Sequence, residues 1–293
     1  MSKELKVAVL GAGSTMGLPI ARNIARAGIQ VRGWNRTAEK AKPLEEDGAL
    51  VFDTASEAAD GAGVILTMLA DADAVINAVE AAVKSSRDDA IWIQMSTIGE
   101  TGTDRCAELA DGHSLTLIDA PVLGTKQPAE EAKLVVLASG PESARERAQP
   151  IFDAVAQKTM WVGEAGAGTR LKMVANSWVL TVTEGTAEAI ALAEGLGLDP
   201  QLFLDAIEGG TLDLPYLRIK AKAIMERSFE PSFRLTLAAK DARLIEESAQ
   251  RHEIDVPLFS TIRRRLAEGA EEHGDEDFCA TYLTSAPQQR DRS

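Results

Sequence analysis

Residues 6–17 of this chain read KVAVLGAGSTMG. The apolar run at 6–10 predicts a strand, the glycines predict a tight turn, and Met16, Ile20 and Ile24 recur at helical spacing. A second apolar strand follows at residues 31–34. This order is typical of a dinucleotide-binding fold, in which a diphosphate lies on the turn and the helix N-terminus. The segment therefore predicts redox chemistry.

The turn gives a phosphate close access to the backbone. Gly11 permits the tight turn, and Gly13 lacks the Cβ that would block a phosphate. The helix N-terminus presents free N–H groups and a partial positive charge. Gly17 comes one residue later than the third glycine of the usual G-x-G-x-x-G spacing, so the turn is longer than the common form. We predict cofactor contacts at Gly11, Ala12, Gly13, Ser14, Thr15 and Met16.

The end of the second strand indicates which dinucleotide binds. NAD enzymes place Asp or Glu here for the ribose 2′-hydroxyl, whereas NADP enzymes offer a cation to the 2′-phosphate. This chain has Asn35, Arg36 and Thr37, without a carboxylate. A guanidinium can hold a phosphate through two hydrogen bonds or stack on adenine, so NADP(H) is favoured and NAD(H) is less favoured. The alternative is that Arg36 is a solvated loop residue.

Composition excludes several functions. The net charge of −14 argues against nucleic acid and anionic membranes as partners. The two cysteines lie far apart, offering neither a disulfide framework nor metal-ligand spacing, and the three histidines stand in polar, turn-like or helix-end surroundings. No apolar run has transmembrane length, and no signal peptide precedes the first strand, so we expect a cytoplasmic protein. An anionic cofactor needs local positive charge, for which the candidates are Arg36, Lys126, Arg170, Lys172 and Lys240.

Short apolar runs alternate with helical patterns as far as about residue 163. This alternation predicts an α/β Rossmann-type domain with a mostly parallel sheet and helices on both faces. Ligand loops lie at the carboxyl ends of such strands and here include Met68, Leu69, Ala70, Ser96 and Thr97. The further strands are expected at 50–52, 64–68, 91–94, 115–118, 134–137 and 160–162.

From about Thr169 the pattern is helical as far as Gly195, and no strand pattern follows. Such a helix spans about 40 Å, too long for one small domain to cover, so we expect it to join the first domain to an all-α second one. Its few charges predict a buried surface and a homodimer or homotetramer. We predict a cofactor domain at 1–165, a helical substrate and dimerisation domain at 166–284 and a disordered tail at 285–293.

Lys172 is the candidate proton donor. It lies near the start of the long helix, and Asn176 follows four residues later on the same face, where the two domains are expected to meet. Carbonyl reduction needs a donor beside the oxygen that becomes negative, and a partly desolvated ammonium near a helix N-terminus suits that task. The alternative is an ordinary surface lysine.

These motifs, in this order, resemble the β-hydroxyacid dehydrogenase family between Val7 and Tyr282. Besides the glycine turn and the 35–37 loop, they are the segments 95–97, 119–126 and 166–176 and the pair Lys240-Asp241. The continuation of the second segment through 127–130 is most similar to the glyoxylate/succinic semialdehyde reductase branch.

The resemblance implies a part for each motif. Lys172 would be the acid/base, Asn176 would position it and the substrate, Lys240 would reach the cofactor, and Thr97 would lie by the nicotinamide. Asp241 shares a helix face with apolar residues, so it should point inward, either in a site or in a structural ion pair. The substrate-binding residues would be Ser96, Val122, Leu123, Gly124 and Thr125.

Two residues depart from the family pattern. Leu123 replaces a serine whose hydroxyl holds the substrate carboxylate, and Ser177 replaces a second asparagine after the lysine. Losing one neutral hydrogen bond costs about 0.5–1.5 kcal/mol, and backbone N–H groups of Gly124 and Thr125 remain available to a carboxylate. A less polar substrate is therefore compatible with this loop.

The sequence thus predicts an NADP(H)-dependent oxidoreductase that interconverts small aldehydes or ketones, such as semialdehyde acids or glyoxylate, and hydroxy acids. An alternative is an imine reductase of the same superfamily, which Lys172 disfavours and Leu123 mildly favours. Another is a cofactor-binding interaction module without turnover. The physiological substrate, and dimer against tetramer, are left open.

Overall fold

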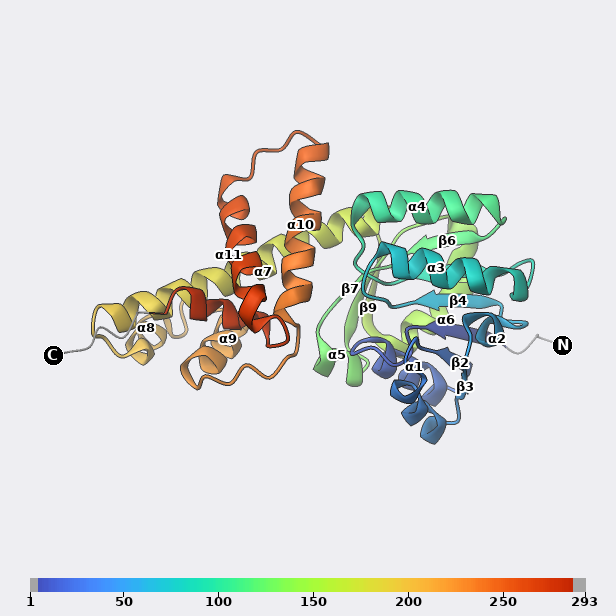
Figure 1. Ribbon diagram of the computed structural model, residues 1–293, viewed down its shortest axis with the longest axis horizontal. Helices are drawn as coiled ribbons and strands as arrows, with labels where there is room; N and C mark the ends of the chain where they lie inside the picture. The colour runs from blue at the N-terminus through green and yellow to red at the C-terminus, as the bar shows by residue number, and fades with distance from the viewer. Residues whose placement is uncertain (1–4, 287–293) are drawn as a thin grey trace. The chain divides into compact units, whose positions relative to one another are not determined.

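A computed structural model describes residues 5–286 of the chain. The chain divides into two compact units, and the boundary falls between Met173 and Val174. Figure 1 shows the sheets of the first unit and the helices of the second. Each unit is described by itself below.

The first unit contains a six-stranded, wholly parallel sheet in the order β3-β2-β1-β4-β5-β6. Strands β4 and β5 are buried throughout and mostly apolar, as expected where helices cover both faces. The predicted Rossmann-type sheet is confirmed. The strands are β1 (Lys6–Leu10), β2 (Gln30–Trp34), β3 (Leu50–Phe52), β4 (Val64–Thr67), β5 (Ile91–Gln94) and β6 (Thr116–Asp119).

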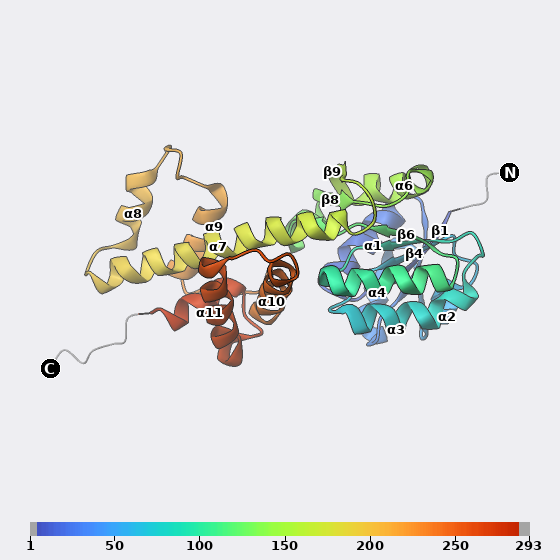
Figure 2. The same cartoon turned by 90° about the horizontal axis from the view of Figure 1, so that it is seen from above.

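Helices pack on both faces of this sheet (Figure 2). One apolar core includes buried residues of α1 and α6, and a separate core includes those of α2, α3 and α4. The carboxyl ends of the strands stay clear for loops. The helices are α1 (Gly17–Arg26), α2 (Ala55–Ala59), α3 (Ala72–Ala82), α4 (Gly99–Gly112), α5 (Lys126–Glu130) and α6 (Arg145–Val155).

A second, three-stranded sheet was not expected. It consists of β7 (Val122–Leu123), β8 (Leu134–Ala138) and β9 (Ala156–Trp161), with β7 antiparallel and β9 parallel to β8. The strands predicted at 134–137 and 160–162 therefore exist, but outside the main sheet. Exposed Gln157 and Lys158 make β9 suitable for a sheet edge and not for a buried centre.

The long predicted helix is present as α7 (Ala167–Gly195), which crosses the boundary between the units. Among residues 162–286 no strand follows it, so the helical character predicted for the second part of the chain is confirmed. One apolar core of the second unit lies between α7, α8, α9 and η5. The remaining elements are α8 (Pro200–Ile207), α9 (Pro215–Met225), α10 (Leu235–Arg251), α11 (Pro257–His273) and the 3-10 helix η5 (Phe278–Thr284).

The predicted tail falls mostly outside the described residues. Ser285 and Ala286 both donate backbone N–H groups to the carbonyl of Tyr282 at 2.8 Å, and residues 287–293 lie beyond the described range. Across residues 5–286, none of the helices combines the length and apolar character that membrane crossing requires.

Candidate cofactor and catalytic site

The glycine turn lies between the carboxyl ends of β2 and β4. The N–H groups of Gly11 and Ala12 both donate to the carbonyl of Trp34 at 2.9 Å. Gly11 has a φ of +97°, and a Cβ there would lie 2.2 Å from the Met68 carbonyl oxygen. Glycine is therefore required for the tight turn, as predicted.

Gly13 serves a different purpose from the one predicted. A Cβ at this position would lie 2.7 Å from the carbonyl carbon of Lys40, so the missing side chain admits the chain at residues 40–41. The Gly13 N–H donates to Asn35 Oδ1 at 3.3 Å. The turn is thus packed against the loop that follows β2, and the predicted clearance for a phosphate is not what this glycine supplies here.

Ser14 accounts for the extra residue in the turn. Its hydroxyl accepts a hydrogen bond from the Gly17 N–H at 2.9 Å and donates to the Met68 carbonyl at 3.1 Å. A Cβ on Gly17 would lie 2.1 Å from the Gly11 carbonyl oxygen. Gly17 therefore allows the close packing that the third glycine of the usual motif allows one residue earlier.

The start of α1 suits an anion. Its first turn contains no acidic residue, the side chain that holds the Gly17 N–H is the neutral hydroxyl of Ser14, and Thr15 is exposed. A helix N-terminus without a carboxylate attracts negative charge. These residues fit the diphosphate of a dinucleotide.

The loop at residues 35–37 is held by Asn35, which donates from Nδ2 to the Thr37 carbonyl at 2.9 Å. Arg36 and Thr37 are exposed. Lys40 is also exposed, and its carbonyl carbon and Cβ lie beside Gly13. The residues predicted from the sequence to bind the cofactor did not include it. A second cation within one helical turn of Arg36 was the signal that could have identified it.

Ser96 has another role besides the predicted substrate contact. It is 1% exposed, and its hydroxyl accepts a hydrogen bond from the Leu69 N–H at 2.8 Å. Its own N–H donates to Gln94 Oε1 at 2.7 Å. Ser96 therefore holds the Met68–Ala70 loop, in which Met68 is buried and Ala70 is exposed, while Thr97 is half-buried.

The predicted substrate loop follows β6. Val122 and Leu123 pair with Val136 and Val135 of β8. Val122 is buried, Leu123 and Thr125 are half-buried, and Gly124 is exposed. The loop therefore offers exposed backbone at Gly124 beside an apolar side chain at Leu123.

Lys172 is buried in the first unit, with 8% of its surface exposed. Its Nζ donates to the Val122 carbonyl at 2.7 Å. The ammonium is therefore held against the predicted substrate loop, and the surface-lysine alternative is wrong.

Asn176 and Lys240 are linked through Asp241 in the second unit. Asn176 Nδ2 donates to Asp241 Oδ2 at 2.7 Å, and Lys240 Nζ lies 2.9 Å from Asp241 Oδ1. Asp241 is 3% exposed, which confirms the prediction that it points inward. It forms an ion pair with Lys240, one of the two arrangements that the sequence allowed. It belongs with the candidate site residues, although the predicted set omitted it.

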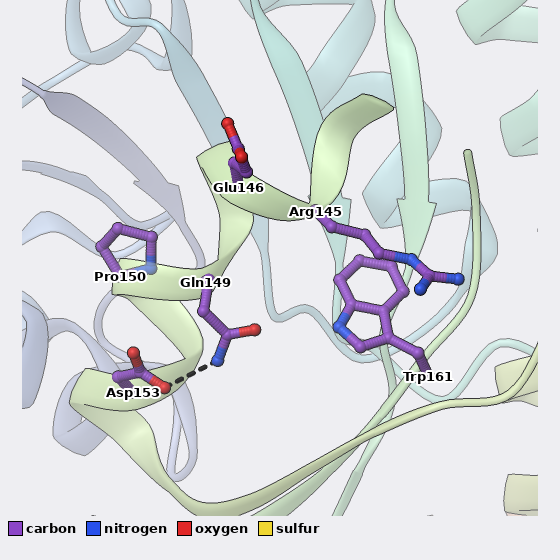
Figure 3. A pocket seen from close by; sticks show the side chains of 6 residues that line it. All are labelled: Arg145, Glu146, Gln149, Pro150, Asp153 and Trp161. Atoms are coloured by element: carbon purple, nitrogen blue, oxygen red, sulfur yellow. Dashed lines mark hydrogen bonds between the residues drawn. The ribbon is translucent and has the colours of Figure 1, made fainter. Parts of the chain in front are cut away.

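Other cavities and reactive groups do not compete with this site. A surface hollow of about 390 Å³ between α6 and β9 is lined by Arg145, Trp161 and four neighbours, with no predicted site residue (Figure 3). Burial raises the pKa of the Cys106 thiol to about 12, which makes it unreactive. Within residues 5–286, no group of three or more His, Cys, Asp or Glu residues could hold a metal ion.

Comparison with known proteins identifies the family of this chain. The family model for the NAD binding domain of 6-phosphogluconate dehydrogenase matches residues 6–163. The model for NAD-binding of NADP-dependent 3-hydroxyisobutyrate dehydrogenase matches residues 166–284. The chain belongs to the β-hydroxyacid dehydrogenase family. It is an oxidoreductase with NAD(P)-binding domains, and the predicted family is confirmed.

Three relatives show how far the likeness extends. A probable 3-hydroxyisobutyrate dehydrogenase of Mycobacterium tuberculosis is 33% identical over 286 residues, covering 95% of this chain and 97% of its own. Glyoxylate/succinic semialdehyde reductase 1 of Arabidopsis thaliana is 27% identical, covering 94% and 96%. The solved structure of Mycobacterium tuberculosis 3-hydroxyisobutyrate dehydrogenase with L-serine is 31% identical, covers 96% of this chain and 98% of that one, and has a TM-score of 0.86.

Proposed function

We propose that this protein is an NADP(H)-dependent reductase that interconverts small aldehydes or ketones, such as semialdehyde acids or glyoxylate, and hydroxy acids. The observation that carries the proposal is the buried ammonium of Lys172, 2.7 Å from the Val122 carbonyl in the loop after β6. A buried lysine beside that loop is suited to hold a proton at a substrate oxygen.

The chain's own residues divide the work. Bound nicotinamide supplies or takes the hydride. Lys172 gives a proton to the carbonyl oxygen or takes one from the hydroxyl, and the backbone N–H groups of Gly124 and Thr125 hold a substrate carboxylate. Asn176 and Lys240, both on Asp241, orient the substrate and the cofactor respectively.

The choice of NADP(H) over NAD(H) rests on the loop after β2. Arg36 and Lys40 are both exposed there, and residues 35–37 contain no carboxylate. Two cations can bind a 2′-phosphate, whereas an NAD site needs an acceptor for the ribose hydroxyl. Arg36 is the residue expected to distinguish the two cofactors.

Assembly, domain limits and location are part of the same proposal. Trp178, Leu192 and Leu196 on and after α7 are 62%, 64% and 67% exposed, which supports burial in a homodimer or homotetramer. The matches ending at 163 and starting at 166 support the limits 1–165 and 166–284. A cytoplasmic location is part of the proposal on the basis of composition, since the two distant cysteines offer no disulfide framework.

Two alternatives remain to be tested against it. An imine reductase is supported by apolar Leu123 and opposed by Lys172. A module without turnover is opposed by the presence together of Lys172, Asn176 and Lys240.

The test is a panel of semialdehydes, glyoxylate, ketones and cyclic imines, each assayed with NADPH and with NADH by the loss of reduced-cofactor absorbance. The proposal expects turnover of carbonyl acids with NADPH. Turnover of imines alone would show that the protein is an imine reductase instead. NADPH binding without turnover of any substrate would support the non-catalytic module.

A further inference from the structure

Asp119 caps the helix that carries Lys172, although it comes from 50 residues earlier in the chain. It ends β6 and is fully buried. Its Oδ2 accepts a hydrogen bond from the Thr169 N–H at 2.7 Å, and its Oδ1 accepts one from the Thr169 hydroxyl at 2.8 Å. The first N–H groups of a helix have no partner within it, so Asp119 supplies one from a distant strand.

Ser139 completes the cap. Its hydroxyl donates to Asp119 Oδ2 at 3.1 Å and accepts a hydrogen bond from the Gly168 N–H at 2.9 Å. A Cβ on Gly168 would lie 2.2 Å from the Leu137 carbonyl oxygen. The first turn of α7 is therefore in direct backbone contact with β8 and has no room to shift toward it.

A carboxylate is a costly choice for this position. Burial raises the pKa of Asp119, while the hydrogen bonds from Thr169 and Ser139 oppose the rise. Its charge faces the positive end of α7. A serine or asparagine caps a helix at lower desolvation cost, so the buried charge requires a further reason.

The reason for a buried charge lies in a second contact, three residues after Asp119 and three residues after Thr169. Val122 follows Asp119 by three residues, Lys172 follows Thr169 by three, and Lys172 Nζ donates to the Val122 carbonyl at 2.7 Å. Helix residues three apart lie on the same side, separated by about 4.5 Å along the axis. The segment 119–122 thus holds α7 at two points, the cap and the ammonium.

We propose that Asp119 is a positioning residue for Lys172, whose ammonium stays at the Val122 carbonyl because the Asp119 carboxylate fixes the first turn of α7. The consequence for catalysis rests on the proposed function, in which Lys172 transfers the proton. The placement of the ammonium is a separate property that exists without cofactor or substrate.

A matched pair of variants isolates the cap. Thr169→Val keeps the side-chain shape and the N–H but removes the hydroxyl, which donates to Asp119 and lies 3.0 Å from the Thr103 hydroxyl. Thr169→Ser restores both contacts. Asp119→Asn keeps the volume of the side chain and removes the charge. All three leave Lys172 and Val122 unchanged.

The first measurement uses the cofactor-free protein. Acetic anhydride modifies exposed amines, and mass spectrometry compares the modification rate of Lys172 with that of exposed Lys158 in the same sample. Asp119→Asn and Thr169→Val should raise the relative modification rate of Lys172 by about fivefold, which corresponds to the free energy of one ordinary hydrogen bond. Thr169→Ser should match the wild type.

The second measurement separates kcat from binding. With glyoxylate and NADPH, kcat of Asp119→Asn should fall by up to about 100-fold, because a small displacement of the proton donor is enough for such a loss. The apparent pKa in its kcat profile should also shift, while the Kd for NADPH stays within about twofold of the wild type.

The outcomes distinguish the two proposals. Wild-type labelling at Lys172 in folded Asp119→Asn and Thr169→Val overturns the positioning role, and if Asp119→Asn does not fold, the Thr169 pair decides. If Lys172→Ala keeps its kcat, the proposed function fails while the labelling still tests the placement. If Lys172→Ala loses kcat and Asp119→Asn keeps it, the positioning role alone fails.

Discussion

Two helices, α1 and α7, begin in the first unit beside the carboxyl ends of parallel strands, and their N-termini are satisfied in opposite ways. The first turn of α1 has no acidic residue, and its Gly17 N–H is held by the neutral hydroxyl of Ser14. The first turn of α7 meets the buried carboxylate of Asp119. Since a helix N-terminus attracts negative charge, α1 suits an anion from solution, whereas α7 is fixed by an anion of the chain itself. We therefore expect the α1 end to serve binding and the α7 end to serve fixed geometry.

Lys172→Ala tests the α7 end and should have the largest effect. Because it removes the proposed proton donor, kcat should fall by about 10²–10⁴-fold, the usual contribution of general acid–base catalysis. The Kd for NADPH, measured by fluorescence titration, should change little. Lys158→Ala, at an exposed lysine of the same unit, is the control and should keep full activity. A kcat near that of the wild type would remove Lys172 from the mechanism.

Gly17→Ala tests the α1 end. The new Cβ would lie 2.1 Å from the Gly11 carbonyl oxygen, so the turn must open. We expect the Kd for NADPH to rise on the order of 100-fold, as the turn loses its geometry. The matched control is Gly112→Ala in α4, where a Cβ meets nothing within 4 Å. Tight NADPH binding by a folded Gly17→Ala protein would contradict the close-packing role.

Arg36→Ala tests which dinucleotide binds, through the loop after β2 that packs against the glycine turn. If the guanidinium holds the 2′-phosphate, the Kd for NADPH should rise by about tenfold or more, the weight of one charged hydrogen bond, and the Kd for NADH should stay the same. Arg105→Ala, at an exposed arginine of α4, is the control. Equal losses for both cofactors would count against a phosphate clamp.

The pH dependence of stability gives the smallest effect. Burial raises the pKa of Asp119 above 3.8, so the folded protein holds this proton more tightly than the unfolded chain. Its contribution to the free energy of unfolding is greatest below pH 3.8 and is lost as pH rises through the folded pKa. The wild type should therefore lose stability relative to Asp119→Asn from acidic to neutral pH, as measured by urea unfolding. A parallel pH dependence would show that Asp119 does not titrate differently in the folded state.

The two helix ends also differ in how far the sequence predicts them. The strand at 6–10, the turn and α1 follow from local patterns of apolar residues and glycines, as does the length of α7. The partners of the turn do not, because Met68 and Lys40 approach it from distant segments. For this reason the sequence predicted that the missing side chain of Gly13 makes room for a phosphate, whereas it makes room for residues 40–41.

The same limit applies to the candidate catalytic residues. Lys172 and Asn176 could be selected from their spacing on one helix. The cap at Thr169 and the contact of Ser96 with Leu69 join residues 50 and 27 positions apart, and no periodicity in the sequence records such pairs. The separate sheet of β7, β8 and β9 was missed for the same reason, since strand runs do not reveal their pairing.

The most direct test of the difference between the two helix ends is a crossed measurement on Lys172→Ala and Gly17→Ala. Each variant is assayed for NADPH binding by fluorescence titration and for kcat with glyoxylate at saturating NADPH. We expect Lys172→Ala to bind NADPH like the wild type and lose kcat, and Gly17→Ala to lose binding and retain most of its kcat once saturated. Loss of binding by Lys172→Ala, or a loss of kcat by saturated Gly17→Ala equal to that of Lys172→Ala, would contradict the division between a binding end and a catalytic end.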